Sequence, residues 1–380
     1  MTILRPFRSR RPIARAPRRA LLTTALLGLL GAADNAGAVT VFEKDDAKLE
    51  IYGLLDIGLG YLQHSYAASD VLASTINPYN LNASPHSYTG LYTGGASMSR
   101  LGLRGEAEFA PGSKAFFRFE SAVSTTSGVL SNNGQAIYNN IGRLHSANSA
   151  SAINGQYFAR AAYGGLSDPS WGSLEVGRTT NFALEQVAEY DPLQAALLYS
   201  PIGYSGGIGG GLGATENSRL DESLRYEHKV GPVGFGAQYK LAGDKTSQAA
   251  GYGWVGMLSY ATGPLSLKAT ASEMTNTVTW PVAYSNVVAP DANVQVENTK
   301  GYLLTALYKV GNATAKAGYE SLTVWAPSNT HLSIRDYYGL LPPKPSVNAA
   351  GQQYFSLYWI GGDYHFTPEF DLAAACARRH

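Results

Sequence analysis

Apolar and polar residues alternate along most of the chain, and this is the period of a β-strand. Between residues 99 and 109, Leu, Leu, Ala and Phe occupy alternate positions, and Arg, Arg, Glu and Glu lie between them. After a turn at residues 110–113 the alternation resumes, with Phe117 and Phe119 on one face and Arg118 and Glu120 on the other. The pattern predicts a β-hairpin with one apolar face and one ionised face.

The same alternation recurs in about 13 segments, and helical periodicity is absent throughout. The segments are residues 49–61, 99–109, 114–123, 156–164, 172–178, 223–226, 233–241, 252–260, 265–272, 302–309, 313–323, 354–366 and 372–375. We therefore expect an all-β fold of antiparallel strands.

The connections between these segments alternate in length. Short turns at residues 110–113, 168–172, 231–232, 262–264, 310–312 and 367–368 take turns with long polar stretches at about 63–96, 127–155, 181–218, 276–298 and 326–351. Short turns at one rim and long loops at the other are typical of a transmembrane β-barrel of the bacterial outer membrane. A soluble sandwich would show similar alternation within its strands. Aromatic residues at strand ends favour the barrel; they are Tyr61, Tyr163, Trp171, Tyr260 and Trp325.

The first 38 residues have the composition of a secretory signal peptide. Seven arginines precede a short apolar run at residues 20–30, and Ala36-Gly37-Ala38 supplies a cleavage site of small residues. We expect cleavage after Ala38 and export to the outer membrane, with residues 39–380 forming the barrel. The apolar run is shorter than a membrane-spanning helix requires.

Charge and cysteine content narrow the function classes. Without the leader the chain keeps 22 basic and 27 acidic residues, a net charge of about −5, so composition gives no support for nucleic-acid binding. Cys376 is the single cysteine, which excludes an intramolecular disulfide. Residues 203–207 satisfy the G-x-S-x-G spacing, but a Gly-rich run follows where a nucleophile elbow needs a helix. We expect no enzymatic activity, no cofactor and no metal site.

Six short motifs, in order, resemble the general Gram-negative porins of the β-proteobacterial type. They are residues 49–56 (LEIYGLLD), 99–105 (SRLGLRG), 114–121 (KAFFRFES), 160–166 (RAAYGGL), 172–178 (GSLEVGR) and 223–226 (SLRY). The resemblance implies a 16-stranded barrel that assembles as a homotrimer and acts as a passive diffusion channel for small hydrophilic solutes and ions. It also implies contact with outer-membrane lipid and with the barrel-assembly machinery.

The resemblance further implies that residues 181–218 form a loop that folds into the pore and narrows it. The expected acidic residues of this constriction are Glu185, Glu189 and Asp191, and the expected basic residues are Arg100, Arg118, Arg160, Arg178 and Arg219. Asp56, Arg104, Glu106 and Glu120 are expected in the lumen. Strict alternation places Arg178 on the lipid face with Leu174 and Val176, so its inward direction requires a break in the strand at Gly177.

The motif order departs from the family near the end of the sequence. Residues 358–368 match the family's twelfth strand and turn, and residues 372–375 begin one further strand, which leaves about three strands missing. This count predicts a truncated or frameshifted product. Two other hypotheses stay open beside the diffusion channel: a non-channel barrel for adhesion or binding, and an outer-membrane hydrolase, which would need a Ser and a His in contact.

Overall fold

The computed structural model describes residues 2–4, 37–65, 86–93, 97–123, 125, 158, 160–195, 205, 219–241, 252–275, 279–284, 287–295, 298–325, 352–367 and 370–379. Most of these residues belong to one antiparallel sheet of fifteen strands. In sheet order the strands are β1 (Thr2–Leu4), β19 (Phe370–Arg379), β18 (Gln353–Thr367), β17 (Ala313–Trp325), β16 (Asn298–Val310), β13 (Leu265–Met274), β12 (Gly253–Thr262), β11 (Val233–Lys240), β10 (Arg219–Val230), β9 (Gly172–Thr180), β8 (Ala161–Asp168), β7 (Ser113–Ala122), β6 (Arg100–Ala110), β3 (Ala47–Leu54) and β2 (Gly37–Lys44).

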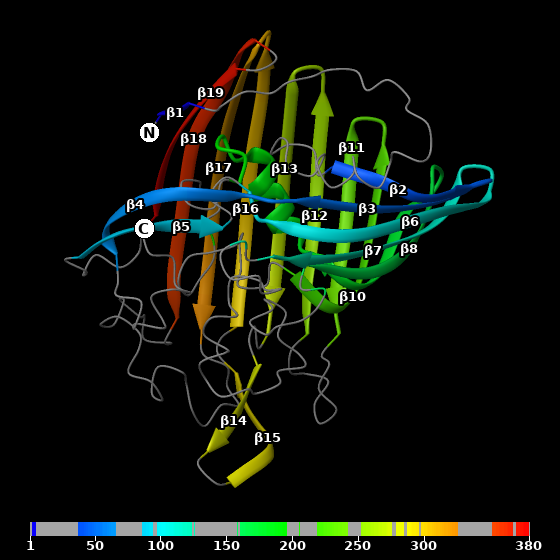
Figure 1. Ribbon diagram of the computed structural model, residues 1–380, viewed down its shortest axis with the longest axis horizontal. Helices are drawn as coiled ribbons and strands as arrows, with labels where there is room; N and C mark the ends of the chain where they lie inside the picture. Colours follow the sequence, from blue (N-terminus) through cyan, green and yellow to red (C-terminus); the bar gives the residue numbers. More distant parts are fainter. Residues whose placement is uncertain are drawn as a thin grey trace.

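The sheet curls into the wall of a barrel. In Figure 1 the strands β11, β12, β13 and β16 to β19 stand upright, and those from β2 to β8 run across them. Strands that are consecutive in the sheet pair antiparallel, as expected for an up-and-down barrel. Among the described pairings none joins β2 to β19 or β1, so the described sheet is not closed into a ring.

Each of the thirteen expected segments contributes a strand to this sheet, and the short turns lie where the sequence predicts them. Two further strands were not expected. One is β1, which lies within the expected leader and pairs with β19. The other is β2. It pairs with β3, and a register shift between Thr40 and Phe42 interrupts its alternation. A β-bulge of this kind moves the apolar residues from one face to the other, which hides the strand from a period-two pattern.

Two of the expected long loops contain strands. The stretch 63–96 carries part of the hairpin β4 (Ile57–Ser65) and β5 (His86–Thr93), and the stretch 276–298 carries the hairpin β14 (Thr279–Tyr284) and β15 (Val287–Gln295). The expected strand 49–61 is also broken, because β3 ends at Leu54. At the break, the Asp56 amide donates to the Ser99 hydroxyl at 2.7 Å, and the Ser97 amide donates to the Asp56 carboxylate at 2.5 Å. These side-chain hydrogen bonds replace the strand ladder.

The expected loop 181–218 contains a nine-residue helix, α3 (Phe182–Tyr190), which the periodicity of the sequence did not indicate. Asn181 caps its first turn by accepting a hydrogen bond from the Ala183 amide at 2.8 Å. A helix this short is marginal by itself and depends on packing against the sheet. No helix among the described residues is long and apolar enough to cross a bilayer.

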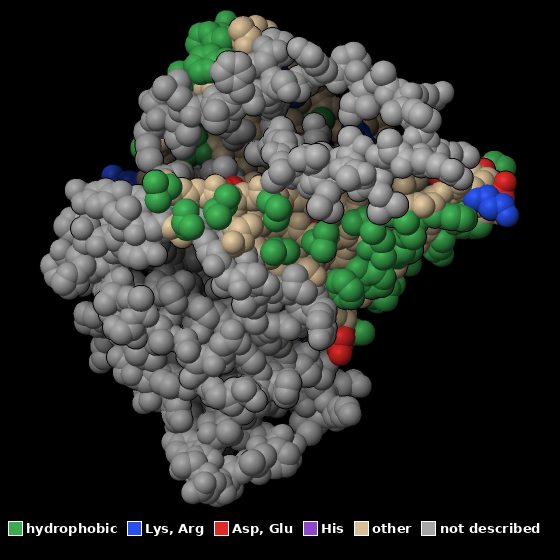
Figure 2. Space-filling model, in the orientation of Figure 1, with side chains coloured by type: hydrophobic (Ala, Val, Ile, Leu, Met, Phe, Trp, Pro, Cys, Tyr) green, Lys and Arg blue, Asp and Glu red, His purple; other side chains and the backbone are tan. Residues whose placement is uncertain are grey.

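The two faces of the sheet differ in character. One face carries exposed apolar side chains, including Leu258, Leu304 and Ile360, which are 57%, 56% and 67% exposed. Figure 2 shows hydrophobic side chains gathered over the region where β6, β7 and β8 lie in Figure 1. Trp171 and Tyr260 are exposed beside short turns, as a membrane-interface belt requires. The other face carries most of the charged strand residues and contacts α3.

Aromatic side chains lie directly over glycines on neighbouring strands. Tyr52 pairs with Gly102 across β3 and β6, and a Cβ atom added to Gly102 would lie 2.2 Å from the Tyr52 ring. Trp359 covers Gly318 in the same way, with 2.0 Å to the indole ring. The glycines allow the rings to lie flat on the inner wall, where their polar atoms reach the groups described below.

Candidate functional site

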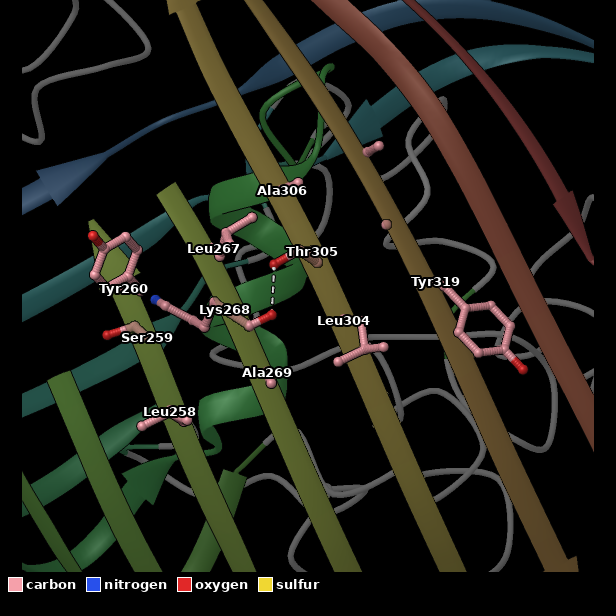
Figure 3. A pocket seen from close by; sticks show the side chains of 12 residues that line it. Leu258, Ser259, Tyr260, Leu267, Lys268, Ala269, Leu304, Thr305, Ala306 and Tyr319 are labelled. Carbon is pink, nitrogen blue, oxygen red and sulfur yellow. Dashed lines mark hydrogen bonds between the residues drawn. The ribbon is translucent and has the colours of Figure 1, made fainter. Parts of the chain in front are cut away.

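Helix α3 lies on the inner face of the wall. Phe182 packs with Leu220, Val255, Met257 and Met274, which belong to β10, β12 and β13. Figure 3 shows the wall beside α3, with the helix on one side of the strands. The shallow apolar groove of about 630 Å³ in that view includes the exposed residues Leu258 and Leu304. Because these side chains alternate with the residues that contact α3, the groove belongs to the outer face and is not a solute site.

The middle of α3 is fixed by a buried glutamine. The Gln186 amide nitrogen donates to the Lys268 carbonyl at 2.9 Å and to the Thr305 hydroxyl at 3.0 Å. The Thr270 hydroxyl donates to the Gln186 side-chain oxygen. Gln186 is fully buried, so these bonds hold the helix at one height on β13 and β16.

The C-terminal end of α3 is held by two donors from the wall. The Trp359 indole donates to the Tyr190 carbonyl at 3.1 Å, and the Lys316 ammonium donates to the Asp191 carbonyl at 3.0 Å. Carbonyls at a helix C-terminus lack partners within the helix, and a cation near them is favourable. The wall therefore supplies what this end of the helix needs.

Three carboxylates surround the Arg225 guanidinium at the other end of α3. Its nitrogens lie 2.7 Å from a Glu185 oxygen, 3.0 Å from Glu227 and 3.4 Å from Glu175. The guanidinium also stacks over the Phe182 ring, 4.2 Å from its centroid. We call Arg225, Glu175, Glu185 and Glu227 the acidic cluster, because it carries a net charge of −2.

The other two acidic residues expected in the constriction differ from each other. Glu189 pairs with Lys268 on β13 and its side chain is 48% exposed. Asp191 is fully buried, and its carboxylate accepts hydrogen bonds from the Leu193 and Ala195 amides at 2.8 and 3.0 Å. Asp191 thus organises the turn after α3, and the expectation that it presents a charge to the lumen was wrong.

Two of the expected arginines contact one carboxylate on the inner wall, and a third lies beside them. Glu120 accepts hydrogen bonds from Arg118 at 2.5 Å, from Arg160, and from the Tyr52 hydroxyl at 2.7 Å. Arg100 lies beside this group and donates to the Ser97 hydroxyl and the Met98 carbonyl. We call Arg100, Arg118, Arg160 and Glu120 the basic cluster, because it carries a net charge of +2.

The structure turns Arg178 to the inner wall. Gly177 has a φ of +132°, and the β9–β10 register shifts between Leu220 and Ser223. The break reverses the parity after Val176, which is 52% exposed, so Arg178 is buried and pairs with Asp221. A left-handed φ is costly for residues other than glycine, so Gly177 permits the backbone turn that brings Arg178 against Asp221.

The remaining expected residues lie in separate places. Arg219 is buried at the start of β10. Arg104 pairs with Glu50 at 2.7 Å, and Glu106 pairs with Lys114 at 3.0 Å, both on exposed parts of the wall. Among the described residues, no cluster of His, Cys, Asp or Glu could hold a metal ion.

Sequence reasoning missed the residues that position α3. Arg225, Gln186, Lys316 and Trp359 were not expected to have a role, because their partners lie from 40 to 169 residues away along the chain. Strand parity does place Arg225 on the same face as Glu227. This parity could have indicated that Arg225 lies on the inner face, but it does not identify Glu185 on α3 as its partner.

The two clusters give the inner wall an uneven potential. The basic cluster lies on β6, on β7 and just before β8, and the acidic cluster lies on β9, β10 and α3. Desolvation raises the pKa of the Glu185 carboxyl above its ordinary value, against the lowering effect of the Arg225 guanidinium. The arrangement can orient a polar or charged solute, and the described clusters offer no nucleophile beside a base.

Comparison with known proteins finds similarity along most of the chain. Residues 23–380 match the family described as Gram-negative porin. The chain is 30% identical over 236 residues to an outer membrane porin protein of Bordetella pertussis, covering 61% of this chain and 50% of that protein. It is 26% identical over 254 residues to outer membrane porin protein 32 of Delftia acidovorans, covering 66% of this chain and 58% of that protein. The chain therefore spans about half the length of the curated relatives it matches.

A solved structure shares the fold. The anion-selective porin from Comamonas acidovorans aligns with a TM-score of 0.58 and 18% sequence identity, over 88% of this chain and 80% of that chain. This likeness supports the barrel architecture.

Proposed function

Since the chain belongs to the Gram-negative porin family, whose members lie in the outer membrane, we propose that it forms a passive diffusion channel for small hydrophilic solutes and ions. The observation that carries the proposal is that the basic cluster and the acidic cluster lie side by side on the inner wall, on the neighbouring strands β6 to β10 and on α3. Residues of both clusters were expected from the sequence to line a constriction, and that role is part of the proposal.

The proposed mechanism is electrostatic filtering. Opposed charges on a narrow, water-filled neck produce a transverse field, which favours hydrated polar solutes over apolar ones. Arginines that face lumen water destabilise a barrel little, whereas on the lipid face near the bilayer midplane each would lower its folding stability by about 2 to 4 kcal/mol. This difference supports an aqueous lumen on the side of the wall that carries the arginines.

The proposal includes the partners that the family resemblance implies. Outer-membrane lipid would cover the exposed apolar face, the barrel-assembly machinery would insert the chain, and three copies would form a homotrimer. The apolar outer face supports the lipid contact, because it leaves large side chains such as Ile360 without a protein cover among the described residues.

A solute-uptake assay tests the proposal. Liposomes that contain the purified chain should swell in isotonic solutions of a pentose and swell more slowly in a trisaccharide, since a narrow neck discriminates by size. Insertion is checked separately by protease protection. Protein that is inserted but admits no pentose would favour the non-channel barrel for adhesion or binding over the channel.

A further inference from the structure

Arg225 joins the constriction helix to the barrel wall. It lies on β10, and its guanidinium contacts Glu185 with two nitrogens, at 2.7 Å and 3.0 Å. It also lies against the Phe182 ring, so two residues in the first turn of α3 contact one wall residue. Planar bidentate contact and ring stacking are properties of arginine that lysine lacks.

The same guanidinium offsets charge on the wall. Glu175 on β9 is directly opposite Arg225 in the strand register, and Glu227 is two residues further along β10 on the same face. Without Arg225 the acidic cluster would carry a net charge of −3 in place of −2. Arg225 is only 8% exposed, so it acts on permeating ions through the field and not by contact.

We propose that Arg225 is a positioning and selectivity-determining residue of the channel: it holds the N-terminal half of α3 against the wall and sets how strongly the acidic cluster attracts cations. The selectivity half of this inference rests on the proposed channel function. The positioning half, that Arg225 holds α3, rests on geometry alone.

Substitutions that change the charge in opposite directions separate the two halves. Arg225→Met keeps an apolar side chain over Phe182 but leaves a cluster charge of −3, Glu185→Gln leaves −1, and the double variant restores −2. One unit charge about 10 Å from an ion in water changes its local concentration about twofold, in opposite senses for anions and cations. The chloride-to-potassium permeability ratio should therefore fall about two- to fourfold in Arg225→Met and rise by a similar factor in Glu185→Gln.

The reversal potential in a KCl gradient near 0.1 M measures this ratio, and the double variant is the decisive case. A field effect predicts that the double variant returns to the wild-type ratio, although the contact between α3 and the wall is lost. A purely structural role predicts that it stays as altered as the single variants, which would overturn the selectivity half. Lys229→Met is the matched control: this exposed residue lies four positions along β10, roughly 13 Å from Arg225 by strand rise. It lies outside the acidic cluster, so its removal should change the ratio less than Arg225→Met does.

The positioning half is tested without any current. Amide hydrogen exchange of α3 in detergent should be slow in the wild type and at least tenfold faster in Arg225→Met, Glu185→Gln and the double variant, with Arg225→Lys in between. Unchanged exchange in Arg225→Met would overturn the positioning role. If the wild type carries no current while amide hydrogen exchange responds as stated, the channel function fails and the positioning role stands. If the wild type conducts and all variants keep its chloride-to-potassium permeability ratio, the channel function stands and the selectivity half fails.

Discussion

The basic cluster rests on hydrogen bonds that converge on one buried residue, Glu120. Tyr52 reaches Glu120 because Gly102 leaves room for its ring. Arg118 and Arg160 each form an ion pair with one oxygen of the Glu120 carboxylate. A buried carboxylate is tolerated when it is fully paired. Sequence alternation could place these arginines on one face, but it could not reveal the glycine under the ring, because that contact crosses two strands separated by the loop after β3.

The variant Gly102→Val tests the packing of this cluster. The added side chain would displace the Tyr52 ring, so we expect a loss of about 1 to 3 kcal/mol in unfolding free energy, as for other overpacked sites. Urea unfolding in detergent micelles measures it. Gly256→Val is the control, since a Cβ atom at Gly256 meets nothing within 4 Å; equal losses in both variants would contradict the account.

Arg100→Ala and Arg160→Ala test the basic cluster as a charge filter. Both should shift selectivity toward cations, about twofold per charge removed at low salt. Arg160→Ala should also lower stability, since it uncovers one side of Glu120, whereas Arg100 contacts no carboxylate. The reversal potential in a salt gradient is the measurement. Lys309→Ala, beside the short turn between β16 and β17, is the control. Unchanged potentials in both arginine variants would disprove the filter role.

Among the elements, α3 departs most from the sequence pattern. The strands were predictable because most of the expected segments repeat a period of two over seven or more residues, with short turns between many of them. A nine-residue helix gives little more than two turns of periodicity. Its buried positions are decided by wall residues far along the chain, such as Thr270, which is 84 positions from Gln186. Tertiary contacts stabilise such helices, so the sequence around α3 alone was insufficient.

Gln186→Leu tests how α3 is held on the wall. The leucine fills a similar space but leaves Thr270 and Thr305 without their amide partner, and each unsatisfied buried polar group costs about 1 to 3 kcal/mol. We expect a lower urea midpoint and wider fluctuations of the open-channel current. Glu189→Gln, whose ion pair with Lys268 is half exposed, should keep the urea midpoint. A wild-type midpoint in Gln186→Leu would show that the glutamine does not hold the helix.

At the scale of the whole molecule, the alternation of strands and the alternation of turn lengths together predicted a curled antiparallel wall, and the fold confirms it. The sequence could not indicate β2, whose bulge breaks the alternation, or the two hairpins in the expected loops. One face of the wall is apolar and exposed, and the other carries clusters of positive and negative charge. A wall with a membrane on one side and water on the other requires two such different faces.

Single-channel recording in planar lipid bilayers tests the central claim, that the charged face lines an aqueous pore. The account predicts discrete current steps in KCl, with a reversal potential that moves toward the cation value when Arg100 is replaced by alanine. Protein that inserts into the bilayer but produces no steps would contradict it.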